Sequence, residues 1–246
     1  MSRKVNIKKL LLLILIPVVI IGLYYFATRD KDNVECKEVE INFNYKTEKP
    51  LLTEADIYKY LELPEGKKSL IGKYAANLKM NEMEQKLLKK SVIKKAEIYM
   101  SMGGKMKFDI TLRHPILRVI PNVKAPYYIC DDRVKIPLSS NFTPDLIPAT
   151  GFMNDKIDRK LYYIVGFVNN NSFWKEQIQQ FFVSENQDIS FIPFTGVHEV
   201  ILGDTSNLDE KFKKLEVFYK KGLSKIGWDK YKSINLKFKG QVICKQ

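Results

Sequence analysis

Residues 83–115 read MEQKLLKKSVIKKAEIYMSMGGKMKFDITLRHP. Apolar and polar residues alternate over 96–102 and again over 106–112, which predicts two half-buried strands. The pair Gly103-Gly104 lies between them, and both glycines can adopt the positive φ angles of a tight turn. The segment therefore predicts a β-hairpin that follows a helix.

The residues before this hairpin complete a compact α+β unit. Residues 39–45 alternate as a third half-buried strand. Thr53 and Asp56 form a candidate capping box for a short helix, and Asn81 with Glu84 is a candidate cap for the helix before the hairpin. The predicted order is strand, helix, helix, strand, strand.

The N-terminal segment predicts a membrane anchor. Residues 10–27, LLLLILIPVVIIGLYYFA, carry no charge, and a helix of this length spans about 27 Å, close to the thickness of a bilayer core. A cleaved signal peptide is the alternative, but its apolar run is shorter and ends in an A-x-A-like site. Four basic residues precede the run, so the positive-inside rule predicts a cytoplasmic tail at 1–9 and export of the remaining chain.

The composition limits the class of protein. The chain has 246 residues, of which 45% are hydrophobic, so it can form a core and is not disordered by composition. The net charge is +13, and subtracting the +4 of the tail leaves about +9 on the exported part. Outside the cytoplasm such charge meets anionic lipids or cell-wall polymers rather than nucleic acid. Its lysines are scattered, which favours an ordinary solvated surface.

The second half of the chain predicts a mixed β region with two or three helices. Apolar residues at helical spacing predict one helix around 157–168 and another around 208–219, with Asn207 and Glu210 as a candidate cap for the latter. Residues 174–182 fit either a helix or a strand. Short apolar runs predict strands at 127–130, 134–138, 146–149, 178–183, 189–193, 199–202, 234–238 and 241–244.

The sequence contains no motif of an active site, metal site or cofactor site. Phosphate-binding, zinc-protease and hydrolase motifs are absent. His114 and His198 are candidate bases without an activated nucleophile, Asp131-Asp132 is a candidate turn, and Asp155 is a candidate helix cap. We predict no catalysis, no metal, no cofactor and no small-molecule substrate.

The three cysteines do not form a disulfide framework. Cys36, Cys130 and Cys244 are odd in number and far apart in the sequence. We expect them to behave as small buried apolar residues. Cys36 and Cys244 can pair only if the fold brings them together.

Several segments, in their order along the chain, resemble the bacterial cell-division family FtsQ/DivIB. In that family a helix leads to a V/I-x-x-A-x-V run, a hairpin and an E-R-x-P ending; Val92, Ala96, Ile98 and Arg113-His114-Pro115 occupy similar positions here. The chain departs from this pattern in having Leu112 at the acidic position and one residue fewer before the proline. Three further segments are similar to motifs of the family's β domain: 127–131, 146–151 and 234–238.

The resemblance implies a domain order and a role. It implies a cytoplasmic tail, a transmembrane helix, a linker, a POTRA domain and a C-terminal β domain, which we place at 1–9, 10–27, 28–36, 37–114 and 115–246. The implied function is a non-enzymatic scaffold at the division septum of the cytoplasmic membrane. Its implied partners are FtsB-like and FtsL-like bitopic proteins that regulate septal peptidoglycan synthesis. Other divisome proteins would contact the POTRA domain or the transmembrane helix.

The resemblance also implies a binding site near the C-terminus, where the family's sheet adds a strand from a partner. The residues expected to form it are Lys237, Phe238, Gly240, Gln241, Val242, Ile243 and Cys244. An exposed edge strand offers unpaired N–H and C=O groups to another chain. Only Lys245 and Gln246 follow the last predicted strand, so we expect it to form an uncovered edge; a central, buried strand is the alternative.

A second class of function remains open at this point. The alternative is a membrane-anchored POTRA-type chaperone or envelope-assembly factor. Such proteins usually carry several POTRA units or a membrane β-barrel, whereas this sequence predicts a single unit.

Overall fold

The computed structural model describes residues 15–22 and 33–246. From residue 33 onward these form two compact units: unit 1 (33–44 and 52–112) and unit 2 (45–51 and 113–246). Of the predicted span 10–27, only the helical residues 15–22 are described, and the tail 1–9 lies outside the described residues. No helix within the described ranges has the length and apolar character needed to cross a membrane.

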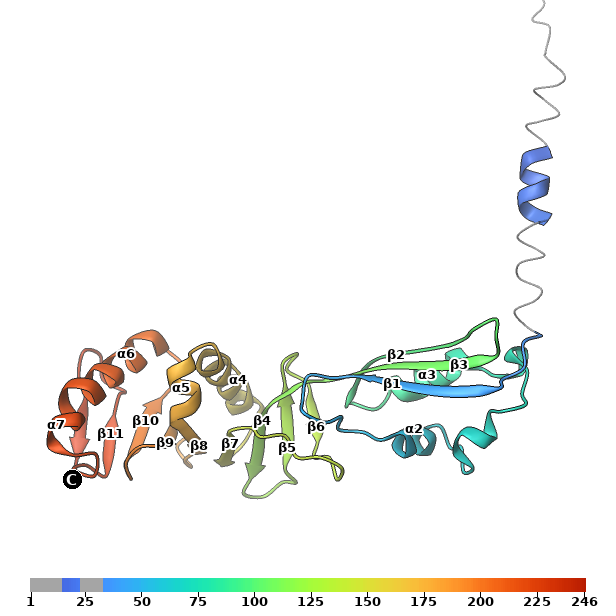
Figure 1. The fold of residues 1–246 in the computed structure, drawn as a ribbon. Coiled ribbons are helices and arrows are strands. Elements are labelled where there is room, and N and C mark those ends of the chain that lie inside the picture. Colours follow the sequence, from blue (N-terminus) through green and yellow to red (C-terminus); the bar gives the residue numbers. More distant parts are fainter. Residues whose placement is uncertain (1–14, 23–32) are drawn as a thin grey trace, which may run out of the picture. The chain divides into compact units, whose positions relative to one another are not determined.

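Unit 1 has the predicted order of elements (Figure 1). Its three-stranded sheet has the order β1-β3-β2, with β1 parallel and β2 antiparallel to the central β3. The elements are β1 (Glu38–Asn44), α2 (Glu54–Tyr60), the 3₁₀ turns η1 (Gly66–Ser69) and η2 (Ala75–Asn77), α3 (Met80–Leu88), β2 (Ile93–Met100) and β3 (Lys105–Leu112).

The hairpin of unit 1 shows why its turn requires glycine. The N–H of Gly104 donates to the Ser101 carbonyl at 3.0 Å, and the N–H of Ser101 donates to the Lys105 carbonyl at 2.9 Å. Gly104 has φ +85°, and a Cβ there would lie 2.4 Å from the Glu35 carbonyl oxygen. Gly103, in contrast, is not at positive φ. Only one of the two predicted turn glycines therefore uses its conformational freedom.

The two predicted helix caps of unit 1 have different outcomes. The capping box of α2 is confirmed, because the Thr53 N–H donates to Asp56 Oδ2 at 2.8 Å and the Asp56 N–H donates back to Thr53 Oγ1. The predicted Asn81 cap is wrong. Helix α3 already begins at Met80, and the Glu84 carboxylate reaches across to β2 instead of to its own helix end.

Unit 2 is built on one nine-stranded sheet with the order β12-β11-β10-β9-β8-β7-β4-β5-β6 (Figure 1). Parallel pairs join β4 to β7, β7 to β8 and β10 to β11, and the remaining pairs are antiparallel. The strands are β4 (Pro115–Pro121), β5 (Tyr127–Cys130), β6 (Lys135–Pro137), β7 (Pro148–Gly151), β8 (Ile178–Val183), β9 (Ile189–Pro193), β10 (Glu199–Gly203), β11 (Ser233–Asn235) and β12 (Ile243–Lys245).

The described part of unit 2 contains more helices than predicted. They are α4 (Asp155–Asn169), α5 (Ser172–Gln177), α6 (Leu208–Phe218), the π-helical turn η3 (Tyr219–Leu223) and α7 (Ser224–Ile226). The prediction of two or three helices is too low because α5 and α7 are too short to show helical periodicity. The ambiguous segment 174–182 contains both structures, since α5 runs directly into β8. Asn154, not Asp155, caps α4, because its side chain accepts the N–H groups of Lys156 and Ile157.

A single row of buried side chains runs across the sheet under these helices. The strand registers align Val119, Ala149, Phe181, Phe191, Val200, Ile234 and Cys244. The first six are fully buried, and Cys244 packs against the same core. Above the row, Phe212 of α6 stacks on Phe191 with ring centroids 5.9 Å apart, and Trp174 of α5 meets Phe212 edge-on at 5.0 Å. This aromatic core fixes α6 on the sheet.

Candidate partner-binding edge

Strand β12 occupies one end of the sheet and pairs with β11 alone among the described strands (Figure 1). The strand covers Ile243–Lys245, so Gln241 and Val242 precede it rather than open it as predicted. The expectation that the last strand lies at an edge agrees with this order. That a partner binds there stays a prediction.

The hydrogen bonds of β11 define which of its residues face β12. The N–H of Glu199 donates to the Lys232 carbonyl, and the N–H of Leu236 donates to the Ile201 carbonyl, both at 2.9 Å. By alternation with Leu236, Ile234 of β11 therefore directs its backbone groups at β10. Because successive residues of a strand alternate, the odd-numbered residues direct theirs at β12.

The same alternation orients β12. Asn235 lies opposite Ile243, and the Lys245 carbonyl accepts the Lys232 N–H at 2.8 Å, so the backbone groups of Ile243 and Lys245 face β11. The N–H and C=O of Cys244 therefore point away from β11, toward the open side of the sheet. One residue of β12 thus offers both a donor and an acceptor to an added strand.

The side chains of β12 lie on opposite faces of the sheet. Cys244 turns toward the helices as the last member of the buried row, and burial raises the pKa of its thiol. Ile243 lies on the helix-free face and is 45% exposed. An added strand at this edge would therefore meet a solvent-exposed aliphatic side chain on one face and the end of the core on the other.

The other expected site residues lie in the turn that leads into β12. Lys237 forms an ion pair with Asp188, with Nζ 2.7 Å from Oδ2. The Phe238 side chain is 50% exposed, and Gly240 adopts φ +67°. Val242 packs partly against the core. The structure therefore brings Phe238 and residues 240–244 together, whereas the Lys237 ammonium is already paired.

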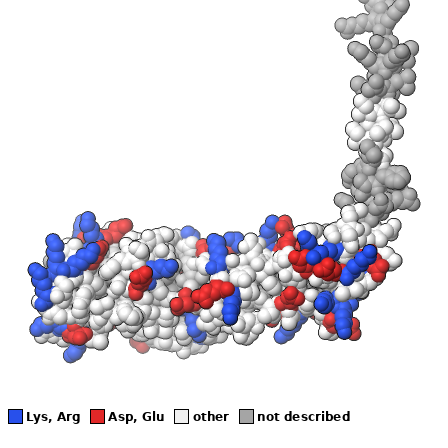
Figure 2. All heavy atoms as spheres, in the orientation of Figure 1, with Lys and Arg blue, Asp and Glu red and all other residues white. Residues whose placement is uncertain are grey.

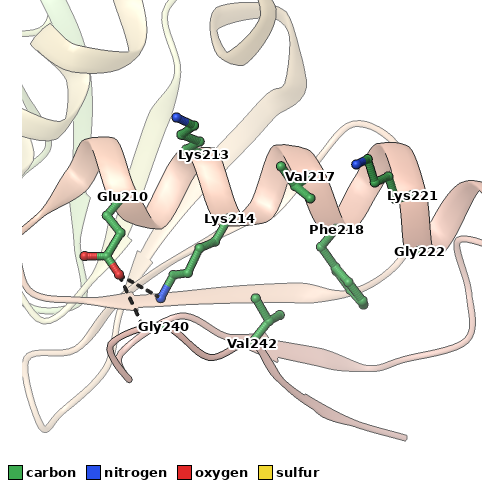
Figure 3. Close-up of a pocket in the computed structure, with 9 residues that line it drawn as sticks. All are labelled: Glu210, Lys213, Lys214, Val217, Phe218, Lys221, Gly222, Gly240 and Val242. Atoms are coloured by element: carbon green, nitrogen blue, oxygen red, sulfur yellow. Dashed lines mark hydrogen bonds and ion pairs between the residues drawn. The ribbon is translucent and has the colours of Figure 1, made fainter.

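A groove of about 630 Å³ lies beside this turn, between α6 and residues 240–242 (Figure 3). Val217 and Phe218 of α6 and Val242 give it apolar walls. Its polar lining comes from Glu210, Lys213, Lys214 and Lys221. The groove therefore combines an apolar surface with three lysines, directly next to the strand edge.

The α6 residues of this groove were missed by the sequence analysis. The helical spacing over 208–219 predicts α6, whose Leu208, Phe212 and Leu215 are buried in the core, but it assigns no role to Val217 and Phe218. Two apolar residues beside that core face, flanked by lysines, are the signal that marks a second apolar surface on α6. The predicted cap of Asn207 with Glu210 is wrong, because Asn207 makes no side-chain cap and Glu210 accepts the Gly240 N–H in the turn before β12.

The edge of unit 1 at β2 is blocked in a way that β12 is not. Because Ser101 N–H bonds to the Lys105 carbonyl, the alternation directs the backbone of Ile98 away from β3. Glu84 of α3 accepts the outward Ile98 N–H at 2.6 Å. A side chain that binds an edge N–H protects the edge from strand addition.

Replacing Glu84 by alanine should therefore expose this edge. We expect the Glu84→Ala variant to lose about 1–3 kcal/mol of unfolding free energy, because the Ile98 N–H loses its partner in a part-buried place. Urea denaturation measures this loss. Glu82→Ala is the matched control, since the Glu82 side chain is exposed and pairs only at the surface with Lys79. Equal losses in the two variants would contradict the protective role of Glu84.

The two histidines are separated in the fold. His114 directly precedes β4 and His198 directly precedes β10, and three strands lie between β4 and β10 in the sheet. His198 is buried, and its Nε2 lies 2.7 Å from the Tyr219 hydroxyl. Burial lowers the pKa of both imidazoles. Asp131 opposes this shift at His114, whereas a hydrogen bond with the Trp228 backbone and the charge of Asp229 oppose it at His198. The structure therefore gives His198 a packing role, and it does not assemble the histidines into one site.

These lowered pKa values predict a loss of stability in mild acid. Below about pH 6.5 the unfolded chain binds protons at these histidines, whereas the folded chain resists them, so the free energy of unfolding falls as the pH falls. We expect His198→Gln to reduce the difference in urea midpoint between pH 7 and pH 5. The pKa of His114 is lowered as well, so part of the pH dependence of stability remains in the His198→Gln variant. An unchanged slope in His198→Gln would contradict this assignment.

The cysteines and carboxylates of the described residues do not form a metal site. No group of three or more His, Cys, Asp or Glu side chains that suits a metal ion occurs within 15–22 and 33–246. None of the three cysteines forms a disulfide; Cys36 and Cys130 are buried, and Cys244 is half-buried. Asp131 and Asp132 lie in the turn after β5, as expected.

Comparisons with known families match both parts of the chain. Residues 114–245 match the family model described as FtsQ/DivIB, C-terminal related, and residues 34–111 match that of a POTRA-like domain. No curated protein is significantly similar to the chain. Together the two family matches imply a scaffold of bacterial cell division. Since the first match covers more than half of the 246 residues, the chain belongs to the FtsQ/DivIB, C-terminal related family.

Proposed function

We propose that this protein binds FtsB-like and FtsL-like division proteins by strand addition at β12 and thereby helps to control septal peptidoglycan synthesis. The observation that carries the proposal is the direction of the Cys244 backbone, whose N–H and C=O point to the open side of the sheet. Family membership supports the general role, and the edge supports the mode of binding. The scaffold holds its partners and performs no chemistry.

The groove beside β12 supports a partner of defined chemistry. In strand addition, main-chain hydrogen bonds supply affinity and side-chain pockets supply specificity. The apolar walls at Val217, Phe218 and Val242 suit aliphatic or aromatic side chains. Lys213 and Lys221 favour carboxylates beside them, and Figure 2 shows basic side chains gathered at the end of unit 2 that carries α7 and β11. The partner segment is therefore apolar with acidic residues.

Photo-crosslinking tests the location of this site. A photoreactive amino acid replaces Ile243, which is exposed in β12, and in a matched variant it replaces Phe194, which is 69% exposed outside the strands of unit 2. The full chain is produced with the FtsB-like protein of the same bacterium. A crosslinked product from position 243 and none from position 194 supports the proposal. Equal products, or none from position 243, would contradict it.

The proposed membrane topology follows from the apolar run 10–27 and the basic tail 1–9. The run anchors the protein in the cytoplasmic membrane at the septum, with both units exported. A reporter that is active only after export, fused behind Gln246, should be active in the membrane fraction. A soluble product that begins near Thr28 would show that the apolar run is cleaved and would contradict the predicted membrane anchor.

A further inference from the structure

Two side chains of α6 hold the turn before β12 by its backbone (Figure 3). The Lys214 ammonium donates to the Phe238 carbonyl at 2.8 Å and to the Gln241 carbonyl at 3.2 Å. The Glu210 carboxylate accepts the Gly240 N–H at 3.2 Å and lies 4.0 Å from the Lys214 ammonium. One acid and one base on neighbouring turns of α6 thus bind three residues of the turn.

This contact matters because β12 has little other support. It is three residues long and pairs with a strand that is also three residues long. Within the described sheet, β12 is therefore held by one short ladder on one side, whereas β11 is paired on both sides. In contrast, α6 is anchored through Phe212 and Leu215, which are both buried in the core of unit 2. The helix therefore supplies the rigid support that the edge strand lacks.

The Lys214 contact is also stronger than an ordinary surface interaction. The Lys214 side chain is only 16% exposed, so most of it packs against the protein, and its ammonium donates to two backbone carbonyls beside Glu210. Hydrogen bonds from a charged donor are shorter and roughly twice as strong as neutral ones. The neighbouring Lys213 lines the same groove but has no such contact with the turn in the described structure.

We propose that Lys214 and Glu210 are positioning residues for the partner edge. They fix residues 238–241 before a partner arrives and so hold β12 in the place and orientation that strand addition needs. Ordering the edge in advance removes an entropy cost from binding. The link to partner binding rests on the proposed function, whereas the fixed position of β12 is a property of the free protein.

Hydrogen exchange of the full chain without a partner tests the positioning role directly. The variant Lys214→Met keeps the length of the side chain and removes the ammonium. We expect the amides of Ile243 and Lys245 to exchange roughly 10-fold faster, because β12 opens more often. Lys213→Met is the matched control, since it removes the same charge from the same helix, and its exchange at β12 should be unchanged. Lys214→Arg, which can still donate to both carbonyls, should restore slow exchange.

The core amides of β9 report whether a variant is folded. If Lys214→Met also loses protection at Phe191, the variant Glu210→Leu replaces it, since it removes the acceptor of the Gly240 N–H and leaves the Lys214 ammonium in place. Exchange at β12 that is equally slow in Lys214→Met and Lys213→Met would overturn the proposal. Where Glu210→Leu replaces Lys214→Met, exchange at β12 that is as slow as in Lys213→Met would also overturn the proposal.

Affinity for the FtsB-like protein provides the second measurement. We expect Lys214→Met to bind roughly 10-fold more weakly than the wild-type chain, and Lys214→Arg to recover the affinity. If the wild-type chain does not bind this protein while Lys214→Met still exchanges faster at β12, the positioning of the edge is supported and only the proposed function fails. An affinity of Lys214→Met equal to that of the wild-type chain would overturn the role of Lys214 in binding.

Discussion

Proline at position 244 should weaken partner binding by about 10- to 100-fold and leave unit 2 folded. Proline removes the one outward N–H of β12, and the partner carbonyl that would accept it is left without a donor. The fold tolerates this change because an edge strand accepts proline where its N–H faces away from the sheet. Titration with the FtsB-like protein measures the binding, and circular dichroism measures the fold.

Proline at position 243 is the matched comparison. The backbone of Ile243 faces β11, so Ile243→Pro should disturb the β11–β12 pair itself. Cys244→Ala controls for the loss of the thiol, since it keeps the backbone N–H. A scan over 241–244 should therefore alternate, with Val242 behaving like Cys244. If Cys244→Pro binds as well as Cys244→Ala, strand addition at this edge is wrong.

Replacing Phe212 by alanine should cost about 3–5 kcal/mol of unfolding free energy in unit 2. Phe212 is 1% exposed and packs against Phe167, Trp174 and Phe191, with centroid distances of 5.0 to 5.9 Å. Its loss leaves a cavity between α6 and the sheet that the neighbouring rings can fill only in part. Urea denaturation gives the change in free energy.

Phe194→Ala is the control for this prediction. It removes the same side chain at a place that is 69% exposed, so it should change the free energy of unfolding by less than about 0.5 kcal/mol. We also expect Phe212→Ala to weaken partner binding, because α6 carries the residues that hold the turn before β12. Similar losses of stability in both variants would show that Phe212 is not a core anchor.

The parts of the fold that depend on local patterns could be predicted from the sequence. The alternation over 96–112 gave the hairpin of unit 1, and the helical spacing over 157–168 gave α4, because both patterns reflect burial of one face. The strand order of unit 2 could not be predicted in this way. Strands β4 and β7 are neighbours in the sheet although they are far apart in the sequence. The alternation of residues within a strand does not indicate which strand pairs with it.

The errors at Glu84 and Glu210 share one physical cause. Each was assigned to the first turn of its own helix, where a carboxylate can satisfy free N–H groups. In the fold each accepts a distant backbone N–H instead, that of Ile98 and that of Gly240. A carboxylate can accept a hydrogen bond from an N–H of its own helix end or from a distant N–H. The sequence indicates only the first kind of donor. For the same reason, the residues expected at the partner edge could be predicted from the resemblance to a family, whereas Lys214 and Glu210, which bind the turn before β12, could be found only in the structure.

Amide exchange at Cys244 tests the central claim most directly. The exchange of the Cys244 N–H is measured in the full chain with and without the FtsB-like protein. Strand addition at β12 predicts that this outward amide exchanges rapidly in the free protein and becomes protected in the complex, while Ile243 changes little because its N–H already faces β11. Tight binding of the FtsB-like protein with no protection at Cys244 would contradict the account.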